Sequence, residues 1–166
     1  LKKRVDLKSG AYLVFDQTEA MTTIDVNSGK SVKQETTENT ALNTNLEATE
    51  AIARHLRLRN IGGIVIIDFI DMSEETHKEK ILKSMSKWLE PDPMTTTINE
   101  VTSLGLVQLT RKRVRDSLER LLCQPCQLCE GTGTIKTIET ICNEILRQIK
   151  QNWERKKPLS VTICAS

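Results

Sequence analysis

Two aspartates lie in β-type stretches of the sequence and could together hold a divalent cation. Asp25 lies in the stretch 22–27, and Asp68 follows four β-branched residues in the stretch 64–71. Because a strand alternates its side chains between two faces, we expect Asp25 and Asn27 to point the same way. Two carboxylates on strands, with an amide beside one of them, suit Mg²⁺ and a phosphate group. The alternative is that both aspartates only cap strands or turns at the surface.

The elements that must position these aspartates follow a strand–helix–strand order. Apolar residues recur at helical spacing between the two aspartates, and Gly62 and Gly63 end that helix just before the second strand. This order indicates a β-α-β unit within an α+β domain. We expect strands at residues 12–15, 22–26, 64–69, 95–101, 104–109 and 160–164, and helices at 45–60, 73–89, 112–122 and 137–153.

Composition allows one domain, alone or with an appendage, and gives little guide to a partner. Of the 166 residues, 38% are hydrophobic and 3% are aromatic, so the core must consist of aliphatic side chains. The net charge of +2 does not by itself indicate nucleic acid, although basic residues cluster locally. No apolar stretch approaches the roughly 18–20 residues of a membrane span, and no secretory signal opens the chain. Because the chain starts at Leu1, we expect it to be an excerpt of a longer protein. The basic residues that could contact phosphates are Arg111, Lys112, Arg113 and Arg115.

Three cysteines fall within seven residues, at Cys123, Cys126 and Cys129. This clustering favours a metal site over a disulfide framework and is typical of a reducing compartment. A structural Zn²⁺ takes four ligands, which this cluster alone does not supply. Either Cys123 and a distant residue complete the set, or a second copy of the chain supplies another pair. The alternative is three free thiols in a turn. Both histidines, His55 and His77, lie on expected helices and are expected to face solvent.

With both features described, the chain resembles the ribonuclease E/G family. The resemblance runs from about Lys8 to Gly133 in the family's order and is weaker beyond that point. The matching stretches are 8–20, 23–29, 44–48, 52–59, 62–72, 104–106, 110–113 and 126–133.

The resemblance implies a DNase I-like mixed sheet with flanking helices at 1–122, a zinc-link at 123–133, and the truncated start of a small α/β dimerisation domain at 134–166. It places the Mg²⁺-binding aspartates on Asp25 and Asp68 and a supporting asparagine on Asn27. It also places the zinc-link cysteines on Cys126 and Cys129, with two protomers sharing one Zn²⁺ as a homodimer. The S1 domain, the RNA 5′-end sensor and the RNase H-like domain of family members have no counterpart in these residues.

The chain departs from the family pattern at three places. Gln127 stands where the family has a proline, and Cys123 is an additional cysteine that complicates the ligand assignment. Residues 92–95 also lack the basic residue that relatives usually carry after the aspartate, which weakens an RNA-facing or packing contact there.

The expected function is a cytoplasmic, Mg²⁺-dependent endoribonuclease acting in RNA processing and decay. As in relatives, we expect it to hydrolyse single-stranded RNA and to leave 5′-phosphate and 3′-hydroxyl ends. Two other functions stay open. One is a non-catalytic, zinc-linked RNA-binding or assembly module, because the cysteine segment also matches one repeat of the DnaJ-type zinc domain. The other is a DNase I-like phosphodiesterase with a different substrate, although such enzymes commonly use a catalytic histidine pair. The basic residues likewise have an alternative role as a solvated helix face.

Overall fold

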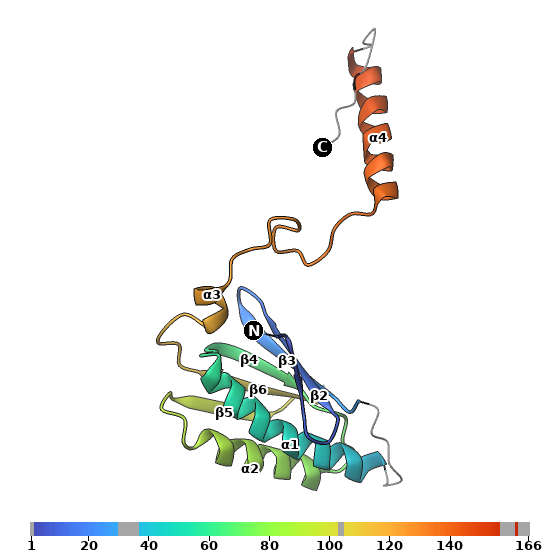
Figure 1. Cartoon of the computed structure of the whole chain (residues 1–166). Coiled ribbons are helices and arrows are strands. Elements are labelled where there is room, and N and C mark those ends of the chain that lie inside the picture. Colours follow the sequence, from blue (N-terminus) through green and yellow to red (C-terminus); the bar gives the residue numbers. More distant parts are fainter. Residues whose placement is uncertain (1, 30–36, 103–104, 157–161, 163–166) are drawn as a thin grey trace. The chain divides into compact units, whose positions relative to one another are not determined.

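The computed structural model describes residues 2–29, 37–102, 105–156 and 162, in two compact units made of residues 1–123 and 124–166. The first unit holds a six-stranded sheet and three helices, and the second holds one long helix (Figure 1). In chain order the elements are β1 Arg4–Asp6, β2 Tyr12–Gln17, β3 Met21–Asn27, α1 Thr37–Leu58, β4 Gly63–Asp68, α2 Glu75–Leu89, β5 Thr96–Val101, β6 Leu106–Arg111, α3 Leu118–Leu122 and α4 Ile138–Lys156.

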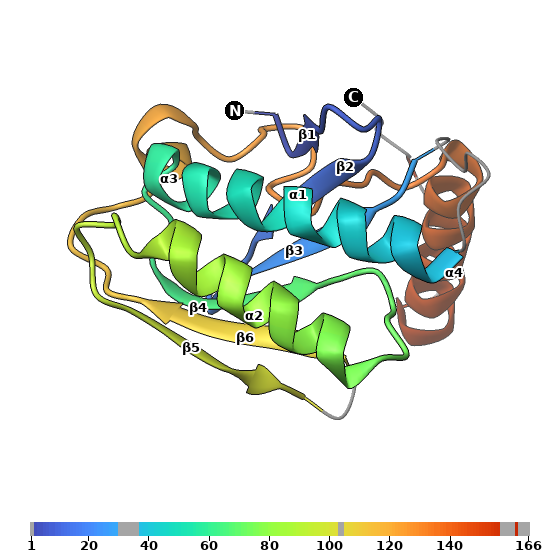
Figure 2. The same ribbon diagram turned by 90° about the horizontal axis from the view of Figure 1, so that it is seen from below.

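The sheet is mixed, with strand order β1-β2-β3-β4-β6-β5. Strands β3 and β4 pair in parallel through the crossover helix α1, and the other strand pairs are antiparallel. Helices α1 and α2 lie side by side across one face of the sheet (Figure 2). The expected α+β class, a mixed sheet with flanking helices, is confirmed.

The core lies between these two helices and the sheet face that they cover. Every second residue of the central strands points into it, as Ile24 and Val26 show for β3. Burial of each large aliphatic side chain contributes roughly 1.5–3 kcal/mol, so this layer holds the sheet against the helices. The fully buried large side chains include Leu13, Ile24, Ile52, Leu56, Val65, Ile67, Ile81, Met85, Val107 and Leu109.

Several sequence predictions were wrong about where helices lie. Helix α1 begins at Thr37, eight residues before the predicted Asn45. Of the predicted basic helix 112–122, α3 covers only the last five residues, because β6 runs to Arg111 and Ser117 caps the short helix through its hydroxyl. Apart from residue 162, the strand predicted at 160–164 lies outside the described residues.

Candidate active site

Asp25 and Asp68 lie directly opposite each other on the parallel strands β3 and β4. Both side chains are exposed, whereas the preceding pair, Ile24 and Ile67, is buried on the helix-covered face. Neighbouring strands are about 4.8 Å apart, so the two carboxylates stand on one open face within reach of a single ion. The alternation of the sequence predicted only that Asp25 and Asn27 share a face. Their role as metal ligands stays a prediction.

Asn27 acts on Asp25 through a direct hydrogen bond. Its side-chain amide donates to Asp25 Oδ2 over 2.7 Å. The two residues are i and i+2 on one strand, so their side chains lie on the same face. This hydrogen bond restrains the rotation of the Asp25 carboxylate.

Negative charge accumulates at this end of the open face. The pKa of Asp68 is raised, first by its partial burial and then by the charges of Asp25 and Asp71. Among the described residues, no lysine or arginine forms an ion pair with any of these three carboxylates. Carboxylates that repel one another are a charge arrangement that a divalent cation relieves.

The residues present fit a Mg²⁺ ion for which water and substrate supply most of the ligands. In the described parts of the chain, no group of three or more histidine, cysteine, aspartate or glutamate side chains gathers to hold a metal. Mg²⁺ is commonly held by one or two carboxylates together with phosphate oxygens and waters. Asp25 and Asp68 supply that smaller set.

A buried side chain of α1 fixes the loop that follows Asp68. Asn45 is fully buried; its amide donates to the Ile70 carbonyl over 2.8 Å, and its carbonyl oxygen accepts from the Ile70 N–H over 3.0 Å. The side chain therefore continues the backbone pairing pattern two residues past the end of β4. From the sequence, Asn45 was expected only as the first residue of a helix, and these two hydrogen bonds were not predicted.

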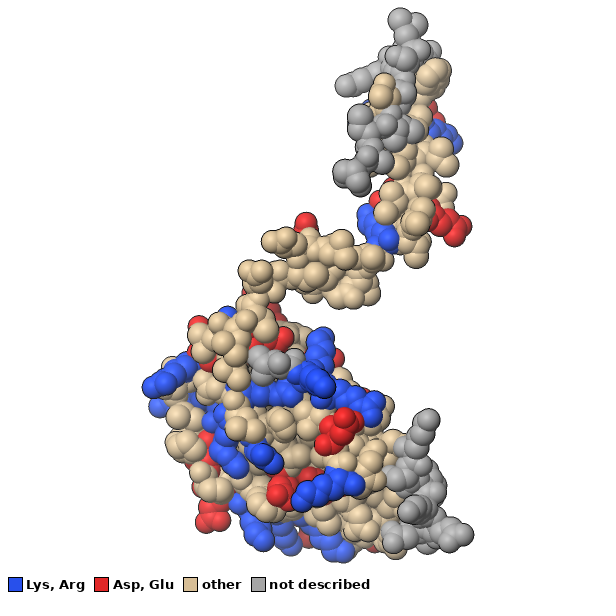
Figure 3. Space-filling view, in the orientation of Figure 1, with Lys and Arg blue, Asp and Glu red and all other residues tan. Residues whose placement is uncertain are grey.

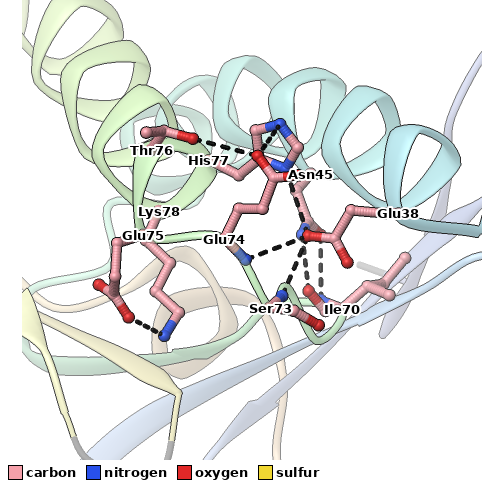
Figure 4. Close-up of polar contacts among 9 residues, drawn as sticks. All are labelled: Glu38, Asn45, Ile70, Ser73, Glu74, Glu75, Thr76, His77 and Lys78. Atoms are coloured by element: carbon pink, nitrogen blue, oxygen red, sulfur yellow. Dashed lines mark hydrogen bonds and ion pairs between the residues drawn. The ribbon is translucent and has the colours of Figure 1, made fainter.

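The same loop is tied to α1 a second time, at the start of α2 (Figure 4). Glu38 Oε1 accepts hydrogen bonds from the backbone N–H groups of Ser73 and Glu74 and lies 3.2 Å from His77 Nδ1. Burial alone raises the pKa of Glu38, but these bonds outweigh it and hold that pKa below its ordinary value. His77 is 6% exposed, so the prediction that it faces solvent was wrong.

Arg111 is not available to contact RNA, and its assignment to the phosphate-binding set is corrected. It is the last residue of β6 and points to the buried face, where its Nε lies 2.8 Å from Asp92 Oδ2. Its Nη2 donates to Asp92 Oδ1 over 3.0 Å and its Nη1 to the Ile61 carbonyl over 2.9 Å. These bonds tie the turn after α2 and the turn before β4 to the sheet.

The other three basic residues of the predicted set are exposed. Lys112, Arg113 and Arg115 lie in the irregular segment between β6 and α3, and Arg113 also donates to the Gly62 carbonyl over 3.0 Å. On the face of the first unit that Figure 3 displays, lysine and arginine side chains are widespread, with acidic side chains between them. Lys112, Arg113 and Arg115 keep their place as candidates for phosphate contacts.

The second unit opens with the turn that carries the paired cysteines. Cys126 is exposed and Cys129 partly so. The backbone N–H groups of Gly133 and Gly131 lower the pKa of the Cys129 thiol, and the Cys126 thiol lowers it further. A turn that favours thiolate fits a metal such as Zn²⁺. Cys123 belongs to the first unit, where its N–H donates to the Glu119 carbonyl at the end of α3.

Nothing in the described residues forms a helix long and apolar enough to cross a membrane.

A mixed sheet with two aspartates on its open face, followed along the chain by a turn with paired cysteines, has the order of elements that the resemblance in the sequence led us to expect. Residues 1–114 match the Ribonuclease E/G family, and the chain therefore belongs to this family. It is 54% identical over 149 residues to Ribonuclease G of Escherichia coli (strain K12). These 149 residues are 90% of this chain and 30% of that protein.

Two further relatives extend the comparison. Ribonuclease G of Haemophilus influenzae is 56% identical over 149 residues, again 90% of this chain and 30% of the relative. Ribonuclease E of Synechocystis is 49% identical over 133 residues, which is 80% of this chain and 20% of the relative. The chain thus spans at most about a third of the length of these curated relatives.

Proposed function

We propose that this chain carries the catalytic centre of a Mg²⁺-dependent endoribonuclease that hydrolyses single-stranded RNA in RNA processing and decay. The observation that carries the proposal is the direct opposition of Asp25 and Asp68 on neighbouring parallel strands. Membership of the Ribonuclease E/G family and identity to proteins named Ribonuclease G support the choice of RNA as substrate. The products are RNAs with 5′-phosphate and 3′-hydroxyl ends.

The proposed chemistry divides between the metal and the side chains. Bound Mg²⁺ supplies Lewis-acid activation of the scissile phosphate and of a water nucleophile. Asp25 and Asp68 hold that ion, and Asn27 keeps the Asp25 carboxylate in one orientation through its 2.7 Å hydrogen bond. No serine, cysteine or histidine nucleophile is required. Contacts from exposed basic residues to RNA phosphates set affinity and register but do not read sequence; the candidates are Lys112, Arg113 and Arg115.

We also propose that two copies of the chain share one structural Zn²⁺ and form a homodimer. One chain offers Cys126 and Cys129, two corners of a tetrahedron, and a symmetry-related pair completes it. The lowering of the Cys129 thiol pKa by neighbouring hydrogen bonds supports thiolate ligation. The cysteine cluster is suited to a reducing compartment, and we propose the cytoplasm.

Cleavage of a fluorescent single-stranded RNA by the full-length protein in Mg²⁺ tests the proposal. Asp25→Asn and Asp68→Asn should each lower kcat at least about 100-fold. Mutation of a residue that only hydrogen-bonds to a metal ligand already lowers metal affinity or activity about 10- to 100-fold. RNA binding should change little, because the exposed basic residues are retained. The matched control is Asp16→Asn, on the same open face in β2.

Two outcomes would contradict the proposal. Near-native cleavage by either aspartate variant would remove the metal role. RNA binding without any Mg²⁺-dependent cleavage by the wild type would favour the non-catalytic, zinc-linked RNA-binding module instead.

A further inference from the structure

An aromatic ring and a guanidinium group are already stacked on the open face of the sheet. Tyr12, on β2, is the only tyrosine in the sequence, and the Arg4 guanidinium carbon lies 3.8 Å from the centroid of its ring. Arg4 Nε also donates to Asp6 Oδ1 over 2.8 Å, which restrains the guanidinium beside the ring. The two side chains are therefore already in contact before any ligand arrives.

This pair lies next to the two aspartates. Tyr12 is directly opposite Asn27 in the β2–β3 pairing, and Asn27 is the residue that holds Asp25. Arg4 is opposite Val14, and Val14 is opposite Asp25, so Arg4 stands two strands away in the same row. With neighbouring strands about 4.8 Å apart, the ring is one strand from the metal-binding side chains. A chain bound across the aspartates would meet the ring next.

Within the described residues of the first unit, the phenylalanine and tryptophan rings are not available on this face. Phe15 and Phe69 are buried at 4% and 5% exposure. Trp88 belongs to α2, which covers the opposite face. Tyr12 is thus the ring that the described open face offers to a ligand.

The chemistry of the pair matches a nucleobase. Proteins hold single-stranded RNA by stacking bases on aromatic rings and on arginine guanidinium planes, next to cationic groups that track the phosphates. The Arg4 side chain is 58% exposed, so its charge remains accessible to a phosphate. Its partner Asp6 is 72% exposed, and an exposed ion pair of this kind is weak enough for a phosphate to replace.

We infer that Tyr12 and Arg4 form a stacking platform for one nucleobase of the RNA, adjacent to the bond that is cut. The inference rests on the proposed function for the identity of the ligand. The platform holds the base, so that the adjoining phosphate lies over Asp25 and Asp68. It is a substrate-binding site and takes no part in bond cleavage.

Binding of a fluorescent single-stranded RNA to the full-length protein, in Mg²⁺-free buffer, tests the platform without requiring cleavage. Tyr12→Ala should weaken binding about 5- to 140-fold, the range that one stacked base is worth. Tyr12→Phe keeps the ring and should bind as the wild type does. Lys83→Ala, an exposed lysine on α2 paired with Glu79, is the control for loss of one surface side chain.

A scan with single abasic nucleotides distinguishes a base-binding site from a merely structural pair. In the wild type, one abasic position next to the cleavage site should weaken binding by the same factor as Tyr12→Ala. In Tyr12→Ala that position should cause no further loss, whereas other positions keep their effects. Arg4→Ala should reduce the effect of the same position.

The platform would be refuted if Tyr12→Ala binds RNA as tightly as the wild type does. It would also be refuted if Tyr12→Ala responds to the abasic positions in the same way as the wild type. Wild-type RNA binding that is too weak to measure would overturn it as well. A protein that shows the predicted profile but does not cleave RNA in Mg²⁺ would refute the proposed function and leave the platform standing. If the wild type cleaves RNA but Tyr12→Ala has an unchanged abasic profile, the proposed function would stand and the platform would be refuted.

Discussion

Replacement of Arg111 by methionine should destabilise the fold without a specific effect on RNA contacts. The Arg111 and Asp92 side chains are 3% and 0% exposed, and two hydrogen bonds of 2.8 and 3.0 Å join them. Met94 N–H is a further donor to Asp92 Oδ1, over 2.9 Å. Methionine fills a similar volume but leaves the Asp92 carboxylate buried without its cation.

The expected loss is about 3–5 kcal/mol in the free energy of unfolding, the cost of removing one partner of a buried pair. For a chain of this length, that loss lowers Tm by roughly 6–20 °C. Removing both charges, as Arg111→Met with Asp92→Leu, should recover more than half of the loss, because no buried charge is left uncompensated.

The dependence of stability on pH is an independent test of the Arg111–Asp92 pair. Burial alone raises the pKa of Asp92, but hydrogen bonds from Arg111 and the Met94 N–H hold that pKa below its ordinary 3.8. Its stabilisation is therefore fully present above about pH 4 and is lost as the pH falls through the lowered value. In Arg111→Met burial dominates, so the difference from wild type should be largest near pH 7 and should shrink in acid.

Urea unfolding followed by circular dichroism, at pH 7 and at a pH of about 2–3, measures both effects. Lys112→Met, the exposed neighbour, is the control and should stay within about 0.5 kcal/mol of wild type. Equal stability of the Arg111 and Lys112 variants, combined with weaker RNA binding for Arg111→Met alone, would refute the structural role and restore the phosphate contact predicted from sequence.

Two further substitutions test the loop after β4 and the cysteine turn. Asn45→Leu removes both hydrogen bonds to the loop and should lower the free energy of unfolding, measured in urea, by about 2–4 kcal/mol; cleavage by this variant should also depend less strongly on Mg²⁺. Asn43→Leu, at an exposed position on the same helix, should lower the free energy of unfolding little. Equal losses for the two variants would contradict the role of Asn45. Cys126→Ser or Cys129→Ser should abolish bound Zn²⁺ and give monomers by light scattering, whereas Cys142→Ser should keep one Zn²⁺ per two chains; a stable metal-free dimer would argue against the shared ion.

Local pattern was sufficient to predict that Asp25 and Asn27 lie on one face of a strand. Alternation along β3 and the strand–helix–strand order are properties of short stretches, so the open-face positions of Asp25 and Asn27 followed from residue spacing alone. The start of α1 did not follow, because its first turns carry little apolar periodicity. Glu38 in that region instead makes its contacts with residues 73–77, which are distant in sequence.

The misassigned Arg111 shows where a charge pattern misleads. A run of basic residues suggests a solvated helix, and that pattern took precedence over the alternation of Val107, Leu109 and Arg111, which places all three on one face of β6. A buried arginine needs an acidic partner, and Asp92 lies 19 residues away in sequence. Only the folded chain shows that pairing.

The single parallel pairing among the described strands is what makes the aspartate pair possible. Asp25 lies near the end of β3 and Asp68 ends β4, and because the strands run in the same direction these positions meet at one edge of the sheet. An antiparallel pairing of the same strands would move Asp68 to the far edge, roughly 13–17 Å away at about 3.3 Å per residue. A slip of one residue would turn Asp68 toward the helices.

Helix α1 therefore has two connected functions in the fold. As the crossover between β3 and β4, it permits their parallel direction. Through Asn45 it also holds Ile70, two residues beyond Asp68, so the strand cannot slip without breaking the two hydrogen bonds to this side chain. The register that places the carboxylates opposite each other is thus fixed from the buried face of the sheet, by a helix that does not itself approach the open face where RNA would bind.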